Sequence, residues 1–177
     1  SEKKQGKPVA DPREDIVAEI EKIAGFLMHP PLVCDHFLSE VYSVSPEENV
    51  VPVLQKMVEK DYSQAPIVKE GYILGLINYE AMARWMAKLT ATPEPLKLFR
   101  ESSIQDVING ITRLKNYRII KKSTDFVTAR EYFVESLGNP HPAEALLITE
   151  TGRRDEPILG IITISEDLEK IIDVLRK

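Results

Sequence analysis

The sequence has little of what an extracellular, membrane-spanning or nucleic-acid-binding protein needs. Its 177 residues include one cysteine, Cys34, so an internal disulfide is excluded and a reducing cytoplasm is the simplest compartment. No apolar run reaches the roughly 20 residues that a membrane-spanning helix requires. The formal net charge of −5 argues against a nucleic-acid partner or an anionic membrane surface, because both attract basic faces.

The residues of catalytic and metal sites are also scarce. Cys34 and His36 are two positions apart, but a nucleophile needs both a base and an orienting group in a formed pocket, so a structural role is favoured. His29, His36 and His141 do not have the spacing of metal ligands. We therefore expect the protein not to be an enzyme, and to have no metal site and no cofactor.

From residue 41 onward the sequence contains two copies of one pattern. Each copy reads as a strand, an amphipathic helix, an apolar strand, a turn, a second apolar strand that ends in glycine and two apolar residues, and a helix. The first copy covers residues 41–57, 64–77 and 78–89, and the second covers residues 117–133, 143–162 and 163–175. A unit of this size buries little apolar surface alone, so we expect the two copies to pack together.

A helix is predicted before the repeats, over residues 11–28. Asp11 is a suitable N-cap, Pro12 suits the first helical position, and Pro30 and Pro31 end the helix. Its apolar residues recur at helical spacing, and we expect that face to cover the repeats or a second subunit.

Local patterns predict several details of the first copy and of the short helix that leads into the second. The buried face of its first helix is expected to consist of Val50, Val53, Leu54, Met57 and Val58. A Lys-Glu-Gly sequence between two apolar runs predicts a hairpin turn, and Ser102 or Ser103 is expected to cap a helix that begins near Ile104. A later apolar stripe reads either as core or as a subunit contact, and consists of Met82, Trp85, Met86 and Leu89.

Short motifs mark the two copies in the same order. They are Ser45-Pro46, Ala65-Pro66-Ile67-Val68, Gly75-Leu76-Ile77-Asn78 and Gly160-Ile161-Ile162-Thr163. This set resembles the cystathionine-β-synthase (CBS) domain, a β-α-β-β-α unit that usually occurs as a tandem pair. The resemblance implies an α/β fold of two such units packed as a pseudo-two-fold pair (a Bateman module), preceded by one amphipathic N-terminal helix. We expect an arm and helix over residues 1–34, repeat 1 over 35–95 and repeat 2 over 96–177.

The resemblance also implies a function. It indicates a regulatory module that binds an adenine nucleotide such as AMP, ADP or ATP between the repeats and signals by a conformational shift. S-adenosylmethionine and a cyclic dinucleotide are alternative ligands. A homodimer is expected, together with an unidentified protein partner or fused domain. The competing hypothesis is a structural dimerisation or protein-interaction module without a small-molecule ligand.

The resemblance carries over to particular residues. In the second repeat Thr163 stands at the hydroxyl position after Gly160, and Glu166 or Asp167 stands near the ribose-binding aspartate position. The purine would lie against Ala145, Leu146 and Leu147. Lys121 or Lys122 would lie near phosphate, although a solvated strand end explains these lysines equally well. We expect this cleft to be the main site, and filling of it by Phe126 or Tyr117 would favour the structural module.

The first repeat departs from the motif. Asn78 replaces the hydroxyl residue, and Ala81 stands where the family has its aspartate, so the ribose-binding carboxylate is missing. The remaining ligand contacts that the resemblance implies here are Ser45, Pro66, Ile67 and Gly75.

Overall fold

The computed structural model describes residues 14–110 and 116–164. The chain divides into two compact units, residues 1–31 and residues 32–177. The first unit contains helix α1 (Glu14–Met28), which ends before Pro30 as predicted, whereas the predicted start at Asp11 lies outside the described residues. The docking of its apolar face and the boundaries of the repeats stay predictions.

The sheet of the first repeat is a hairpin of β1 (Gln64–Lys69) and β2 (Tyr72–Asn78), paired antiparallel. The turn residues Glu70 and Gly71 both have positive φ, as a two-residue type I′ turn requires. The hairpin predicted from the Lys-Glu-Gly sequence is confirmed.

The first strand predicted for this repeat is reduced to one parallel bridge. The N–H of Val44 donates to the carbonyl of Pro66 at 2.9 Å, and the N–H of Val68 donates to the carbonyl of Val44 at 2.8 Å. Pro46 follows two residues later and has no N–H to donate, so the ladder does not continue.

Four helices accompany this sheet: α2 (Val50–Glu59), α3 (Tyr79–Leu89), α4 (Pro95–Glu101) and α5 (Ile104–Gly110). Side chains cap three of them. The Oδ1 of Asn49 accepts from the Val51 N–H at 2.9 Å, and Asn78 caps α3 in the same way. Ser103 Oγ accepts from the Asp106 N–H at 3.3 Å while an Asp106 carboxylate oxygen accepts from the Ser103 N–H at 2.7 Å. Of the two predicted caps for α5, Ser103 is the one used.

The helices bury an apolar core against one face of the hairpin. Val50, Val53 and Met57 of α2 are buried in it as predicted, whereas the prediction for Val58 is wrong, because its side chain is 66% exposed. Val58 lies about 80° round the helix from Val50, at the edge of the apolar arc. The stripe on α3 is core, with Met82 and Trp85 buried and Met86 and Leu89 packed against them.

The second repeat has a three-stranded sheet in the order β3 (Tyr117–Lys121), β4 (Ala145–Thr149), β5 (Gly160–Thr163). β3 and β4 are parallel and joined through α6 (Phe126–Ser136), while β4 and β5 are antiparallel. Asp125 caps α6 by accepting from the Thr128 N–H at 2.9 Å. The helix predicted over 163–175 falls almost wholly outside the described residues.

Residues 32–39, which precede the helices and strands of the first repeat, pack on the second repeat. The short 3-10 helix η1 (Val33–Asp35) brings Val33, and after it Phe37, into the core beneath α6. Leu38 forms an antiparallel bridge with Gly160, and the Ser39 N–H donates to the Leu159 carbonyl at 3.0 Å. The second repeat is therefore completed by residues that come some eighty positions before its own first strand in the sequence.

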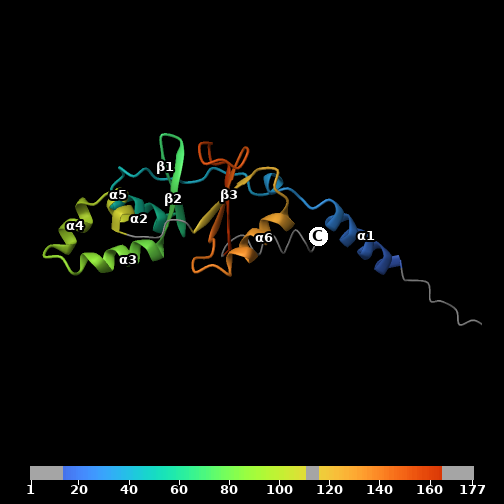
Figure 1. Cartoon of the computed structure of the whole chain (residues 1–177), viewed down its shortest axis with the longest axis horizontal. Coiled ribbons are helices and arrows are strands. Elements are labelled where there is room, and N and C mark those ends of the chain that lie inside the picture. The colour runs from blue at the N-terminus through green and yellow to red at the C-terminus, as the bar shows by residue number, and fades with distance from the viewer. Residues whose placement is uncertain (1–13, 111–115, 165–177) are drawn as a thin grey trace, which may run out of the picture. The chain divides into compact units, whose positions relative to one another are not determined.

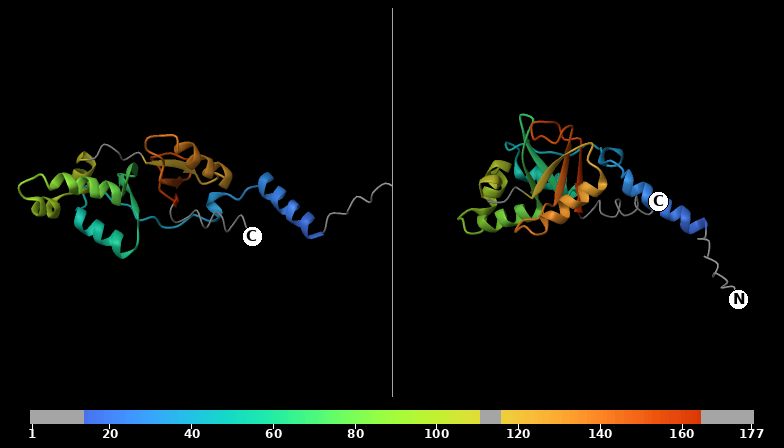
Figure 2. Two further views of the ribbon diagram at one scale, coloured as in Figure 1. Left: turned by 90° about the horizontal axis from the view of Figure 1, so that it is seen from below. Right: turned by 45° about the vertical axis from the view of Figure 1, so that its right-hand side comes forward.

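The two sheets face each other, with α2 and α3 on the outer side of one and α6 on the outer side of the other (Figures 1 and 2). Ile73 and Leu76 of β2 pack against Ala145 and Leu147 of β4 between the sheets. Leu146 and Ile148, which alternate with these residues, face the core beneath α6. All five residues of β4 are buried, because both faces of the strand are covered.

We expect Gly160→Ala to destabilise the protein, because a Cβ there would lie 2.0 Å from the carbonyl oxygen of Phe37. Backbone would have to move, and overpacking of this kind costs about 1–3 kcal/mol. The control is Gly138→Ala, where the nearest heavy atom to a Cβ is 3.9 Å away. Urea unfolding of both variants checks this, and equal stabilities would contradict the close contact.

The contact between the sheets predicts a second effect. Leu147→Ala removes a fully buried side chain from it and should lower the unfolding free energy by about 2–5 kcal/mol. Leu74→Ala, on β2 where the side chain is 42% exposed, should cost much less. The comparison is made by thermal or urea unfolding, and similar losses in the two variants would show that the sheets do not depend on this contact.

Candidate functional site

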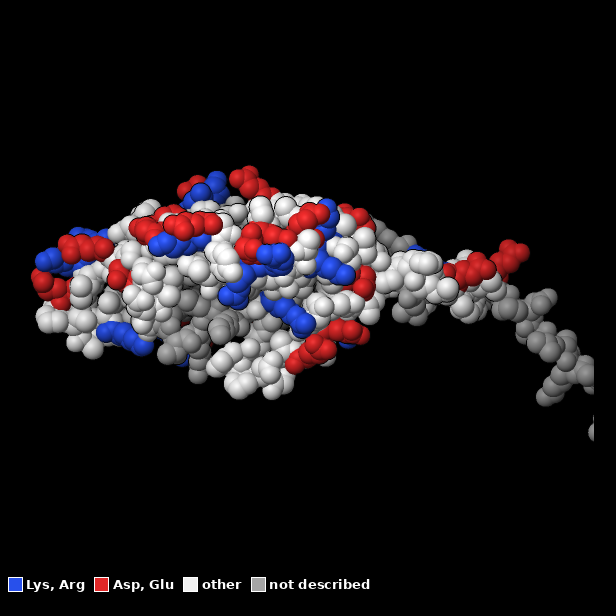
Figure 3. Space-filling model, turned by 45° about the horizontal axis from the view of Figure 1, so that its top comes forward, with Lys and Arg blue, Asp and Glu red and all other residues white. Residues whose placement is uncertain are grey.

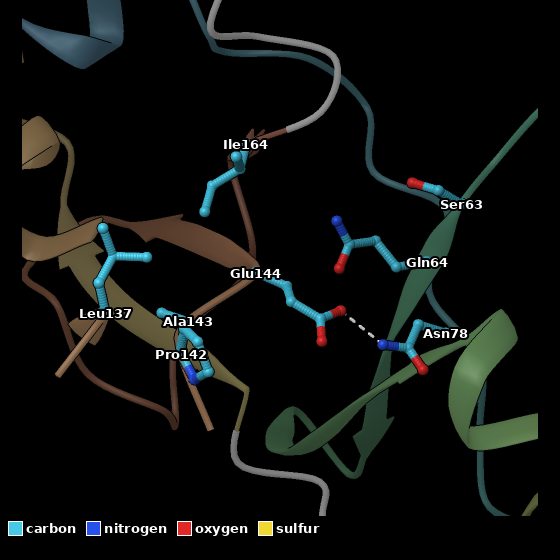
Figure 4. Close-up of a pocket in the computed structure, with 8 residues that line it drawn as sticks. All are labelled: Ser63, Gln64, Asn78, Leu137, Pro142, Ala143, Glu144 and Ile164. Carbon is cyan, nitrogen blue, oxygen red and sulfur yellow. Dashed lines mark hydrogen bonds between the residues drawn. The ribbon is translucent and has the colours of Figure 1, made fainter. Parts of the chain in front are cut away.

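A cavity of about 380 Å³ lies between the repeats, at the end of the hairpin where β1 begins and β2 ends. It is lined by Ser63, Gln64, Asn78, Leu137, Pro142, Ala143, Glu144 and Ile164. The first three residues belong to the first repeat and the other five to the second, and they face one another across the cavity (Figure 4). Its size falls in the range of small-molecule sites, which is roughly 300–1,000 Å³.

Asn78 connects this cavity to helix α3. Its Oδ1 accepts from the Ala81 N–H at 2.8 Å and so caps the helix, while its Nδ2 donates to Glu144 Oε2 at 2.5 Å (Figure 4). The residue is buried, at 8% exposure. One amide therefore joins the start of a first-repeat helix to a carboxylate of the second repeat.

Glu144 is held in place by its backbone. Its N–H donates to the Asn116 carbonyl at 2.7 Å, and its carbonyl accepts from the Ile164 N–H at 3.4 Å. The side chain extends from the start of β4 toward Asn78. Sequence reasoning missed Glu144. The available signal was its position directly before the central strand, which matches that of Ser63 in the first repeat.

Gln64 contributes a polar atom with an unmet hydrogen-bonding capacity. Its Oε1 is buried and has no partner among the described residues. An unsatisfied buried acceptor costs about 1–3 kcal/mol, so such atoms usually meet a water or a ligand. A donor group in the cavity would satisfy it.

The described residues of the second repeat that were predicted to bind the ligand do not line this cavity. The carbonyl of Phe37 lies against Gly160, so this chain's own backbone occupies the space that the glycine leaves open. Thr163 is buried, at 4% exposure, and has a hydrogen-bond or electrostatic partner. Phe126 is part of the core beneath α6, and Tyr117 packs between the sheets. Glu166 and Asp167 lie outside the described residues.

The other predicted contacts lie away from the cavity wall. Ala145, Leu146, Leu147 and Ile67 are fully buried core residues. Pro66 and Gly75 are buried within the hairpin, and the Ser45 N–H donates to the Glu48 carboxylate at 2.6 Å. Among the cavity-lining residues, Asn78 is the one that the sequence predicted as a ligand contact.

The two lysines differ in their surroundings. Lys122 Nζ lies 2.7 Å from Glu150 Oε1, and this hydrogen bond raises the pKa of the lysine. The side chain of Lys121 is exposed, while its backbone lies against Gly152. Neither lysine lines the cavity.

Among the described residues, the remaining chemically reactive side chains form no second site. Partial burial and the neighbouring Asp35 carboxylate raise the pKa of the Cys34 thiol, which makes it a weak nucleophile. Across residues 14–110 and 116–164, no group of three or more His, Cys, Asp and Glu side chains is arranged to hold a metal ion. None of the described helices has the length and apolarity to cross a bilayer. On the face shown in Figure 3, acidic and basic side chains are interspersed.

A family model for the CBS domain matches residues 23–88. Among solved structures, the CBS domain of a membrane protein from Sphaerobacter thermophilus is 18% identical with a TM-score of 0.63, over 90% of this chain and 98% of that one. CbpB in complex with c-di-AMP is 17% identical with a TM-score of 0.58, over 90% and 95% of the two chains. CBSX2 in complex with AMP is 16% identical with a TM-score of 0.57, over 82% and 98%.

The comparison with curated proteins finds no match. At 16–18% identity the solved structures show a shared fold, and they share it over both repeats. The family model adds a sequence match across the first repeat. Together, these findings show a sequence match to the CBS domain over residues 23–88 and the fold of CBS-domain pairs over both repeats.

Proposed function

We propose that the protein is a regulatory module that binds an adenine nucleotide or a related adenosyl ligand between its two repeats. The observation that carries this proposal is the cavity of about 380 Å³ at Asn78, which combines apolar walls with four polar side chains. Two proteins of the same fold support it, because one is in complex with c-di-AMP and the other with AMP.

The lining suits the two chemical faces of a nucleoside. Leu137, Ala143 and Ile164 offer apolar surface for the flat faces of a purine. Gln64 Oε1 can accept from an amino group at the purine edge, and Glu144 can accept from hydroxyl groups. The second-repeat set of Thr163, Glu166, Asp167 and Gly160, with a phosphate near Lys121 or Lys122, remains a proposal for a second site.

The mechanism would be a shift between arrangements of the repeats. A ligand that contacts both repeats favours the separation at which both sets of contacts form, and its differential affinity sets the size of the shift. Asn78 would transmit this change to α3, whose N-terminus it caps. A partner or a fused domain would read the change, and the module itself would catalyse no reaction.

Self-association remains part of the proposal, but not through Trp85. That side chain is buried in the core of its own chain, at 4% exposure. A dimer would use exposed residues instead, and α4 presents Leu96 and Leu98, which are 72% and 39% exposed. Sedimentation at micromolar concentration tests for a dimer.

The first test is ligand stabilisation. A ligand at one hundred times its Kd raises the unfolding free energy by about 2.7 kcal/mol, so AMP, ATP, S-adenosylmethionine or c-di-AMP should raise the Tm by several degrees. Differential scanning fluorimetry measures this. If none of these ligands shifts the Tm at millimolar concentration, the sensing function is refuted and the interaction module is favoured.

The second test separates binding from stability. Asn78→Ala should weaken ligand binding about tenfold and also lower stability by about 1 kcal/mol, because a helix cap is lost. Asn49→Ala is a matched control, because Asn49 caps α2 and also donates its Nδ2 to the Arg100 carbonyl at 2.8 Å, outside the cavity. Calorimetric titration should show a weaker affinity for Asn78→Ala alone. Equal affinities in the two variants would move the ligand away from Asn78.

A further inference from the structure

The first-repeat motif lacks the hydroxyl-binding carboxylate, and the start of helix α3 cannot supply one. Ala81 stands where the family motif has aspartate, and its side chain is buried in the core beneath α3. Glu80 lies one position earlier on the helix, and its carboxylate is engaged by Arg84 at 2.7 Å on the exposed surface. A hydroxyl-binding carboxylate at this end of the cleft must therefore come from another element.

Glu144 lies in the required place. It starts from the other repeat, and its Oε2 accepts from Asn78, the residue that occupies the hydroxyl position of the first-repeat motif. A carboxylate has about four lone-pair sites, so this single hydrogen bond leaves acceptor capacity on both oxygens. Glu144 lines the cavity and can therefore present that capacity to a ligand.

The charge of the described lining also restricts the ligand. Among the eight lining residues, Glu144 is the charged one, and none is Lys, Arg or His. A phosphate placed inside would meet a carboxylate without a compensating cation, which is costly at a partly buried position. At about 380 Å³ the cavity is near the lower end of ligand-site sizes, which suits one nucleoside.

We propose that Glu144 supplies, from the second repeat, the hydroxyl-binding carboxylate that the first repeat lacks, and that the cavity takes the nucleoside part of the ligand. Any phosphate would then lie outside the cavity and add little affinity. This inference rests on the proposed function, because it names the ligand class and the selecting residue of the same site. It also links the ligand to both repeats, since the ribose would bind Glu144 of the second repeat while Gln64 of the first repeat contacts the edge of the base.

The experiment is a calorimetric titration of the wild-type chain, Glu144→Gln and Glu150→Gln with adenosine, 2′-deoxyadenosine, 3′-deoxyadenosine and AMP. Glutamine keeps an oxygen that can accept from Asn78 but removes the charge. Glu150→Gln makes the same chemical change at an exposed residue, which pairs with Lys122 outside the cavity. Thermal unfolding without ligand checks that each variant is folded.

We expect the wild-type chain to bind AMP within tenfold of adenosine and to bind at least one deoxyadenosine ten- to a hundredfold more weakly. Glu144→Gln should lose a similar factor for adenosine and no longer distinguish it from that deoxy form. Glu150→Gln should behave as the wild type does.

Several results would overturn the inference. The inference fails if Glu144→Gln binds adenosine normally, or if this variant loses the same factor of affinity for adenosine and for both deoxy forms. It also fails if the wild-type chain binds AMP more than a hundredfold tighter than adenosine. Each of these outcomes leaves an adenosyl sensor in place with a different selecting residue. If the wild-type chain binds none of the four ligands nor any ligand of the thermal screen, the proposed function fails as well. Should Glu144→Gln not fold, equal wild-type affinities for adenosine and both deoxy forms would still refute it.

Discussion

The apolar contact between the two sheets holds the second unit together. Each repeat has one sheet face covered by its own helices, and the opposite face can be buried only by the other repeat. Strand β4 shows this dependence most clearly, because all five of its residues are buried and successive side chains enter different cores. The same contact fixes Glu144 opposite Asn78, so the packing that stabilises the pair also builds the cavity.

The two repeats are not equivalent in the structure, although they share one sequence pattern. Residues 32–39 cross to the second repeat, where Leu38 pairs with Gly160 and Phe37 enters the core. Gly160, the first residue of β5, thus accommodates the chain's own backbone there. In the first repeat, the start of β1 and the end of β2 border an open cavity. The symmetry of the repeated sequence pattern is therefore broken by one short segment.

A site shared between two packed repeats has a simple regulatory property. The binding free energy of a ligand there depends on the distance between cavity walls that belong to different repeats. Ligand occupancy and the arrangement of the repeats are therefore linked. This link is strongest where one residue both lines the cavity and holds an element of a repeat in place. Asn78 caps α3 and bonds to Glu144, so the ligand that we propose would act on a helix end as well as on the cavity if it competed for or reinforced this bond.

The sequence by itself determined the features that depend on neighbours along the chain. Helical spacing identified Val50, Val53 and Met57 as core, and the Lys-Glu-Gly turn identified the hairpin, because each is decided within a few residues. The cap of α5 was narrowed to Ser102 or Ser103, of which the structure uses Ser103. Val58 was misjudged because the edge of an apolar arc is set by what packs against it. The partners of Gly160 and Asn78 were decided only by tertiary structure. Phe37 and Glu144 are far away in sequence, 66 residues in the case of Asn78 and Glu144, and no local pattern encodes which distant side chain packing will bring opposite.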